Sequence, residues 1–237
     1  MKNQTKIEFV NHASVLISYG KIGILSDPWY FSSVFNKGWR LIYENQMDYI
    51  KSVFSKTTHI YISHEHPDHF NPKFLLDRSI KDLIIKNNII FIFQETKDKR
   101  VVNFLKKNSF TVKECKLDKI IKLNNNEEVD IKISRHDFYD SSIAIFTPDK
   151  KILNLNDCPL KEKNDIENFK KKHGVFDVLL TQFSYAAWKG SEKNVKLRQL
   201  AAKEKIDAII SQSKILNCKY VIPFASFIYF SNKMNFY

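Results

Sequence analysis

The sequence has 237 residues, of which 43% are hydrophobic and 14% aromatic. This composition excludes a disordered or fibrous chain and suits one globular domain with a full core. The net charge of +12 is carried mostly by lysines scattered along the chain, which favours an anionic small-molecule substrate and gives only weak support for a nucleic-acid partner.

The first quarter of the chain predicts closely spaced strands. Alternating β-branched and aromatic residues mark strands at 7–10, 14–19 and 22–26, which short turns join into a β-meander. The aromatic segment 30–44 has no regular pattern. A short helix at 48–54 then precedes a strand at 58–62.

Helices and strands follow in mixed order after residue 70. Helical patterns cover 72–77, 98–107, 161–172 and 192–216, the last with a break near Asp207. Further strands are predicted at 88–93, 110–115, 120–123, 129–134, 142–146, 152–155, 176–180 and 220–222. Two sheets covered by helices satisfy this order, within a single α/β (α+β) domain over residues 1–237.

The sequence indicates a cytoplasmic location. It shows no secretory leader and no apolar run of the roughly 18–20 residues that a membrane span needs. Three widely spaced cysteines, Cys115, Cys158 and Cys218, argue against a disulfide framework. We therefore expect no membrane partner, and the oligomeric state is left open.

The residues with the clearest chemistry are His64, His66, Asp68 and His69, directly after the strand at 58–62. Side chains on an extended backbone repeat every two residues, so the first three start on one face. Pro67 then ends the strand and turns the chain back. Imidazole and carboxylate groups that converge at a strand end predict a site for zinc or a similar metal.

Two other interpretations of this cluster exist. A histidine-rich tract that binds metal loosely is one alternative. The helical zinc motif His-Glu-x-x-His does not fit, because position 68 is Asp and Pro67 would break the helix.

The motif resembles the first metal motif of the metallo-β-lactamase fold superfamily, His-x-His-x-Asp-His, and later residues extend the resemblance over essentially the whole chain. The resemblance implies a four-layer αββα sandwich. It also implies that His64, His66 and His136 bind one ion, that Asp68 and His69 bind a second, and that Asp157 bridges them.

One departure concerns the last ligand. The superfamily usually supplies a histidine near the C-terminus, but no histidine follows His173, and Ala225 or Ser226 stands at the matching place. The cofactor implied is therefore zinc as one or two ions, with iron or manganese also open.

Several segments are similar to the lactamase-like part of CMP-N-acetylneuraminate hydroxylase and its bacterial relatives. They include Asp27-Pro28-Trp29, Asn154-Leu155-Asn156-Asp157-Cys158 and Pro223-Phe224-Ala225-Ser226-Phe227. The Rieske module of that hydroxylase is missing, because the chain lacks its Cys-x-His and Cys-x-x-His pairs. Relatives of this kind also continue beyond Tyr237, which leaves truncation at the C-terminus open.

Candidate roles were assigned to residues around the metal. Asp68 would orient a nucleophilic water and carry its proton, and His12 would contact substrate or donate a proton, although a turn histidine without a role is the alternative. Asp27 would fix an imidazole tautomer. A pocket wall for an anionic or sugar substrate is predicted from Tyr185, Trp188 and Lys189.

Three functions follow, in order of preference. The first is a metallohydrolase in which metal-bound hydroxide attacks an anionic small molecule such as a nucleotide sugar or a surface-glycan precursor. The second is an iron-dependent oxygenase or redox component that works with a separate electron donor. The third is a nucleic-acid processing protein, which only the charge supports.

Overall fold

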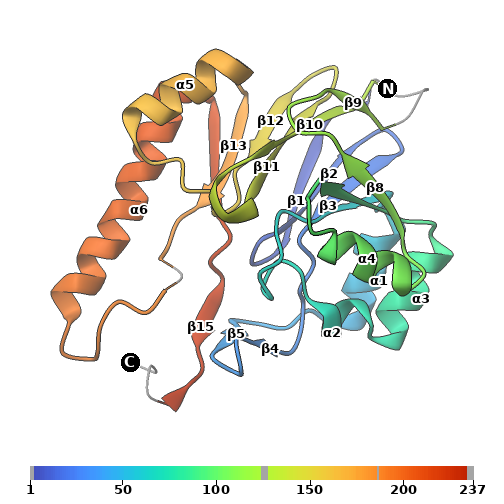
Figure 1. The fold of residues 1–237 in the computed structure, drawn as a ribbon, viewed down its shortest axis with the longest axis horizontal. Helices are drawn as coiled ribbons and strands as arrows, with labels where there is room; N and C mark the ends of the chain where they lie inside the picture. The colour runs from blue at the N-terminus through green and yellow to red at the C-terminus, as the bar shows by residue number, and fades with distance from the viewer. Residues whose placement is uncertain (1–2, 124–127, 186, 234–237) are drawn as a thin grey trace.

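Two six-stranded β-sheets face each other, and helices cover both outer faces (Figure 1). The computed structural model describes the chain except residues 1–2, 124–127, 186 and 234–237. The first sheet has the order β1-β2-β3-β6-β7-β8. Its strands are β1 (Lys6–Asn11), β2 (Ser14–Tyr19), β3 (Ile22–Ser26), β6 (His59–Tyr61), β7 (Ile90–Gln94) and β8 (Thr111–Cys115).

The second sheet comes from the second half of the chain and has the order β14-β13-β12-β11-β10-β9. Its strands are β9 (Ile121–Lys122), β10 (Asp130–Arg135), β11 (Ser141–Phe146), β12 (Lys151–Asn154), β13 (Val178–Gln182) and β14 (Tyr220–Phe224). In both sheets the early pairs are antiparallel and the later pairs parallel.

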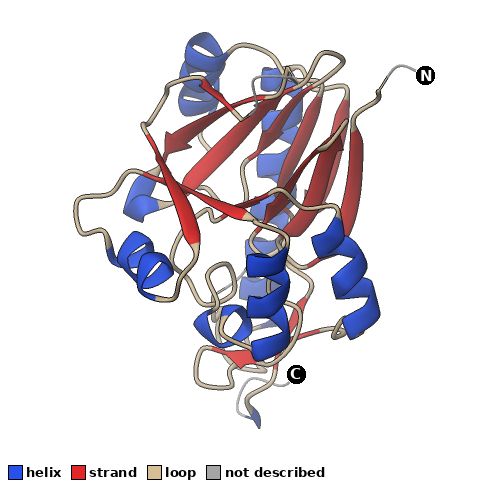
Figure 2. Cartoon of the chain, turned by 90° about the vertical axis from the view of Figure 1, so that its right-hand side faces the viewer, coloured by secondary structure: helices blue, strands red, loops and turns tan. Residues whose placement is uncertain are grey.

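The helices form the two outer layers, as the turned view also shows (Figure 2). On the first sheet lie α1 (Met47–Ser55), α2 (Pro72–Leu75), α3 (Arg78–Lys86) and α4 (Arg100–Lys107). On the second lie α5 (Lys163–His173) and α6 (Val195–Leu216).

Three of the four hydrophobic clusters in the described residues lie at the three contacts between these layers. Alternation along β2 is the clearest case, because Leu16 packs with the α1–α4 layer while Val15 and Ile17 pack between the sheets. On β12, Ile152 packs between the sheets and Leu153 packs beneath α5. The predicted αββα sandwich is therefore confirmed.

Three local predictions differ from the structure. The segment 30–44 is not wholly irregular, because β4 (Ser33–Val34) and β5 (Trp39–Leu41) form a small sheet with β15 (Ile228–Phe230). Helix α3 was not predicted. The expected break near Asp207 is absent, since α6 is continuous.

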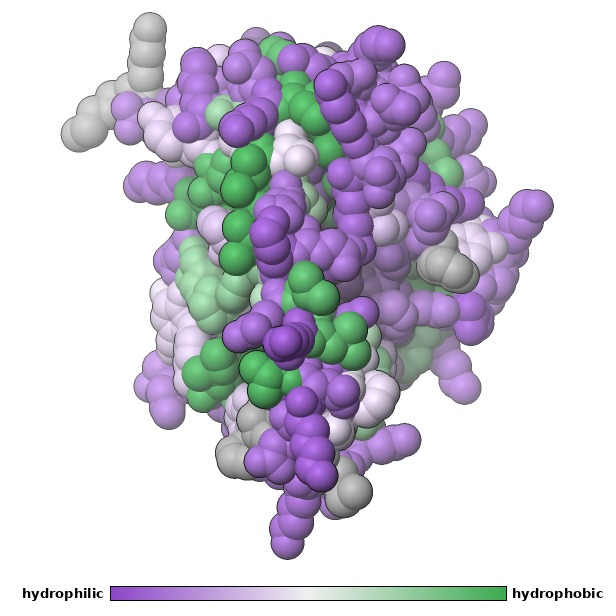
Figure 3. Space-filling view, turned by 90° about the vertical axis from the view of Figure 1, so that its left-hand side faces the viewer, coloured by the Kyte–Doolittle hydropathy of each residue, from purple (hydrophilic) through white to green (hydrophobic). Residues whose placement is uncertain are grey.

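Helix α6 projects from the second sheet and leaves much of its surface open. Figure 3 shows this face as largely hydrophilic, with apolar groups among the charged ones. Leu197, Leu200 and Ile206 are among its exposed apolar residues. Neither α6 nor any other helix in the described ranges combines the length and apolar content of a membrane span.

Candidate metal centre and pocket

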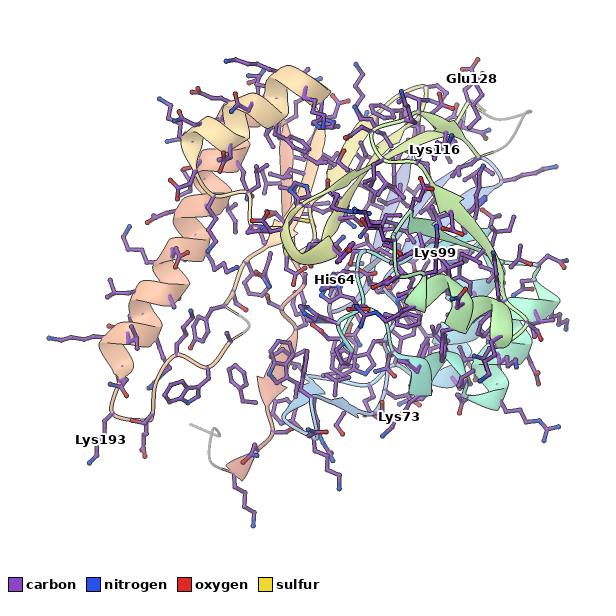
Figure 4. All side chains as sticks on the ribbon, viewed as in Figure 1. His64, Lys73, Lys99, Lys116, Glu128 and Lys193 are labelled. Carbon is purple, nitrogen blue, oxygen red and sulfur yellow. The ribbon has the colours of Figure 1, made fainter. Side chains whose placement is uncertain are left out.

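The predicted metal ligands follow strand ends at one edge of the sandwich. Strands β3 and β6 run parallel in the first sheet, as β12 and β13 do in the second. Residues just beyond the carboxyl ends of such strands meet at a common edge, which is the usual place for a site in open α/β sheets. His64 lies at this edge, between the two halves of the molecule (Figure 4).

A first group of possible metal donors consists of His64, His66 and Asp140. The His64 Nε2 atom lies 2.8 Å from His66 Nδ1 and 3.8 Å from Asp140 Oδ1. Two imidazoles and one carboxylate make a donor set that suits zinc, iron or manganese.

A second group consists of His12, Asp68 and His69, all buried. Asp68 Oδ2 lies 3.3 Å from His12 Nε2 and 3.4 Å from His69 Nε2. This group also contains two imidazoles and one carboxylate.

Asp157 lies between the two groups. Its Oδ1 is 3.9 Å from His64 Nδ1, and its Oδ2 is 3.7 Å from His69 Nε2. His64, His69 and Asp157 themselves form a third possible donor set. This position is the one that a carboxylate bridging two ions would need.

The residues fit a bound metal. Donor atoms held about 2.0–2.2 Å from one ion lie about 2.9–3.6 Å apart. The distances between the candidate donor atoms, 2.8 to 3.9 Å, are close to this range. In addition, Oδ1 of each of Asp68, Asp140 and Asp157 is buried without a hydrogen-bond partner. A buried carboxylate oxygen without a partner is costly, and a cation would relieve that cost.

Asp27 orients one of the imidazoles. Its Oδ2 accepts a hydrogen bond from His69 Nδ1 at 2.9 Å and from the Ser63 hydroxyl at 2.7 Å, while its Oδ1 accepts one from the Ser63 backbone at 2.8 Å. These bonds hold His69 with Nε2 toward the centre, as outer carboxylates do in metal sites. Burial raises the pKa of Asp27, and the neighbouring His69 opposes that rise.

The charges of this centre are strongly coupled. Burial opposes a charge on His69, but the carboxylates of Asp68, Asp157 and Asp27 outweigh it and raise its pKa. Burial, with help from His69, lowers the pKa of His64 to about 3. His64 is therefore neutral at pH 7, which is the form that binds a metal.

His136 does not join these groups. Its Nε2 lies 3.0 Å from the Ser142 hydroxyl, and its ring stacks on Phe169 of α5 at 5.8 Å. The residue that lies in the centre instead is Asp140, four positions later. The sequence carried one signal for Asp140: it lies two residues before the predicted strand at 142–146.

A pocket of about 490 Å³ opens beside the centre. Metal-site residues His66, Asp68 and Asp157 line one part of it. The rest of the lining is mainly aromatic and basic. The aromatic residues are Phe35, Trp39 and Tyr185, the basic residues are Lys161, Lys189 and Lys205, and the others are Gln182, Ala187, Ala201 and Glu204.

Two of the three residues predicted for the pocket wall line it. Tyr185 and Lys189 do so, whereas Trp188 lies outside the lining and is 64% exposed. Lys205 was missed because it sits in a lysine-rich helical pattern that reads as a solvated face. It is half-buried, its Nζ donates to Gln182 Oε1, and burial lowers its pKa.

Solved structures with the same arrangement show what the fold is. CmlA, a diiron β-hydroxylase from Streptomyces venezuelae, aligns over 95% of this chain and 45% of its own with a TM-score of 0.63 and 14% identity. A possible metal-dependent hydrolase from Veillonella parvula aligns over 97% of this chain and 99% of its own with a TM-score of 0.56 and 14% identity. The long form of RNase Z from yeast aligns over 96% of this chain and 40% of its own, with a TM-score of 0.56 and 15% identity.

The metallo-β-lactamase fold protein YhfI from Bacillus subtilis aligns over 91% of this chain and 90% of its own with a TM-score of 0.50 and 13% identity. The chain has the metallo-β-lactamase fold. Curated sequences add a second similarity, to cytidine monophosphate-N-acetylneuraminic acid hydroxylases. The Asterias rubens protein is 35% identical over 68 residues, which is 29% of this chain and 10% of that protein. The Xenopus laevis protein is 26% identical over 162 residues, 65% of this chain and 26% of that protein. No protein-family model matches this metallo-β-lactamase-fold chain.

Proposed function

We propose that the chain is a metal-dependent hydrolase that acts on an anionic small molecule, of which a nucleotide-linked sugar is the class that fits best. The observation that carries the proposal is the contact between the donor groups and a pocket lined by three lysines. His66, Asp68 and Asp157 belong to both. A substrate held in that pocket would place its reacting bond beside the metal.

Each part of the pocket has a task in this proposal. Lys161, Lys189 and Lys205 would bind phosphate or carboxylate oxygens, although Glu204, 2.5 Å from Lys161 Nζ, offsets part of that charge. Phe35 and Trp39, whose rings pack edge to face at 4.7 Å, would contact a sugar or base ring.

The reaction needs only water besides the substrate. A metal ion held by these donors would lower the pKa of a bound water to about 7 and would polarise the reacting group. Asp68 Oδ1, which is buried and without a partner, would orient the attacking water and accept its proton. Hydrolysis therefore requires no electron donor.

The second candidate function is an iron-dependent oxygenase that receives electrons from a separate protein. Asp140 favours it, because two histidines and one carboxylate are the donor set of non-haem Fe(II) oxygenases. The similarity to a diiron β-hydroxylase and to sialic acid hydroxylases adds support. Zinc or manganese without iron in protein purified from unsupplemented cells would remove this candidate.

The test is a product screen in water labelled with oxygen-18. The protein, loaded separately with zinc, manganese or iron, is incubated with nucleotide-linked sugars and sugar phosphates, and mass spectrometry detects products that carry the label. We expect labelled product from wild type and none from His64→Ala. Labelled product of equal amount from His64→Ala, or none from wild type with any metal, would refute the proposal.

Substrate binding is tested on helix α6, which carries the pocket lysine and a matched control. Lys205→Ala should raise KM by about tenfold or more with a smaller change in kcat, since a hydrogen bond to a charged group contributes about 1.5–3 kcal/mol. Lys196, on the same helix but outside the pocket lining, should tolerate the same substitution. An unchanged KM in Lys205→Ala would remove the lysine from the substrate site.

A further inference from the structure

Ala225 and Ser226 stand where the resemblance implies a last histidine ligand. Ala225 has no donor side chain, and the Ser226 hydroxyl donates to the Ala225 carbonyl at 2.7 Å. Neither residue carries an imidazole or carboxylate like those of the other candidate donors. The Ala225 N–H, however, donates to the His12 carbonyl at 2.8 Å, so this segment lies directly against His12.

The His12 ring points from this corner into the second donor group. Its Nε2 lies 3.3 Å from Asp68 Oδ2, and the ring centroid lies 5.9 Å from that of His69. His12 is only 2% exposed, and its Nδ1 is buried without a hydrogen-bond partner. A surface histidine in a turn would show neither feature.

The backbone on both sides of this contact adopts an unusual conformation. His12 has a φ of 34° and Ala225 a φ of 65°, in the left-handed region that non-glycine residues seldom occupy. Such conformations persist where the surrounding structure holds them, and they cluster at functional sites. Asn11 helps to hold this one, because its Oδ1 accepts a hydrogen bond from the His12 N–H at 2.9 Å.

We propose that His12 replaces the absent C-terminal histidine as a ligand of the second metal ion. With Asp68, His69 and the shared Asp157, it completes a set of four protein donors, and the centre holds two ions. The sequence predicted that His12 contacts substrate or donates a proton. The proposal gives it the role of a metal ligand instead. The inference rests on the proposed function only in requiring a metal, and it does not depend on hydrolysis.

The test compares metal binding by wild type and His12→Asn. Asparagine tolerates a positive φ and can still donate to Asp68, but its neutral amide is a poor ligand. Metal-free protein is titrated with Zn²⁺ by calorimetry and with Co²⁺ by visible absorption. His173→Asn, a histidine on α5 away from the centre, is the matched control.

Wild type and His173→Asn should bind two ions. His12→Asn should keep one, and its second should bind more than about 100-fold more weakly, since even an outer-sphere partner contributes about 10–100-fold. The Co²⁺ absorption that the second equivalent adds should fall with it. If His12→Asn unfolds, as circular dichroism would show, His12→Gln is titrated instead.

Two results would overturn the inference. One is a His12 variant that binds two ions with wild-type affinity, which would make His12 a positioning residue for Asp68. The other is a folded wild type that takes up a single ion. Two-ion binding without any hydrolytic product would leave His12 as a ligand and count against the proposed hydrolase alone.

Discussion

At the scale of single residues, the hydrogen bonds around the centre determine which imidazole atom is available. Asp27 accepts a hydrogen bond from His69 Nδ1, which directs Nε2 toward the centre as the atom that would bind a metal. The Ser63 backbone and hydroxyl hold the same carboxylate from two further directions. Asp27 thus orients a candidate donor without belonging to a donor group itself.

Asp27→Asn should therefore weaken metal binding while preserving the fold. An amide nitrogen that faces His69 Nδ1 would donate to it and move the imidazole proton to Nε2, the atom that binds metal. We expect the dissociation constant for Zn²⁺ to rise by about 10–100-fold, as measured by competition with a fluorescent chelator. Asp137→Asn, an exposed neighbour of Asp140, is the control, and equal affinity in both variants would contradict this role.

The sequence predicted the candidate donors that are local, and it missed Asp140, whose position depends on a turn. His64, His66, Asp68 and His69 follow one strand, so their convergence is readable from spacing alone. His136 and Asp140 flank the turn 137–139, in which the His136 N–H donates to the Asp140 carbonyl at 2.7 Å. The conformation of that turn determines whether His136 or Asp140 faces the centre. The spacing of residues in the sequence does not reveal this conformation.

At the scale of elements, long-range pairing was the main obstacle to prediction. Strands β4 and β5 are two and three residues long, and β5 is completed by β15 from the far end of the chain. No local periodicity identifies strands so short. Helix α3, by contrast, did carry a signal that was overlooked, an aspartate before the apolar positions Ile80 and Ile84.

That aspartate caps the helix, and its removal should destabilise the protein. Asp77 Oδ1 accepts hydrogen bonds from the backbone N–H groups of Ser79 at 3.0 Å and Ile80 at 3.3 Å. Asp77→Ala should lower the free energy of unfolding by about 1 kcal/mol, the usual contribution of such a cap. Urea denaturation measures the change. Asp82→Ala, an exposed aspartate within the same helix, should shift the midpoint far less.

At the scale of the whole molecule, the centre joins the two halves of the sandwich. His64, His66, Asp68 and His69 come from the first sheet, whereas Asp140 and Asp157 come from the second. Three buried carboxylate oxygens without partners meet there. Without a cation the two halves bring like charges together, so metal binding and stability are expected to be linked.

Removal of the metal with a chelator should therefore lower Tm, and added Zn²⁺ should restore it. At a free metal concentration of about 1,000 times Kd the stabilisation is about 4.1 kcal/mol. Asp157→Asn, which removes the carboxylate shared by both groups, should respond far less than the surface control Asp149→Asn. Equal Tm values with and without metal would show that the centre does not stabilise the contact between the halves.

The gain in Tm should also grow with pH. Burial, together with the charge of Asp157, raises the pKa of Asp140 to about 7 in the metal-free protein, above its usual value near 3.8. Between these values the folded metal-free protein binds more protons than the unfolded chain, so its stability falls as pH rises. A bound cation removes that cost. Calorimetric scans at about pH 5 and about pH 8, below and above the raised pKa of Asp140, should therefore show the larger metal-dependent increase at the higher pH, and the opposite order would mean that Asp140 does not bind the metal.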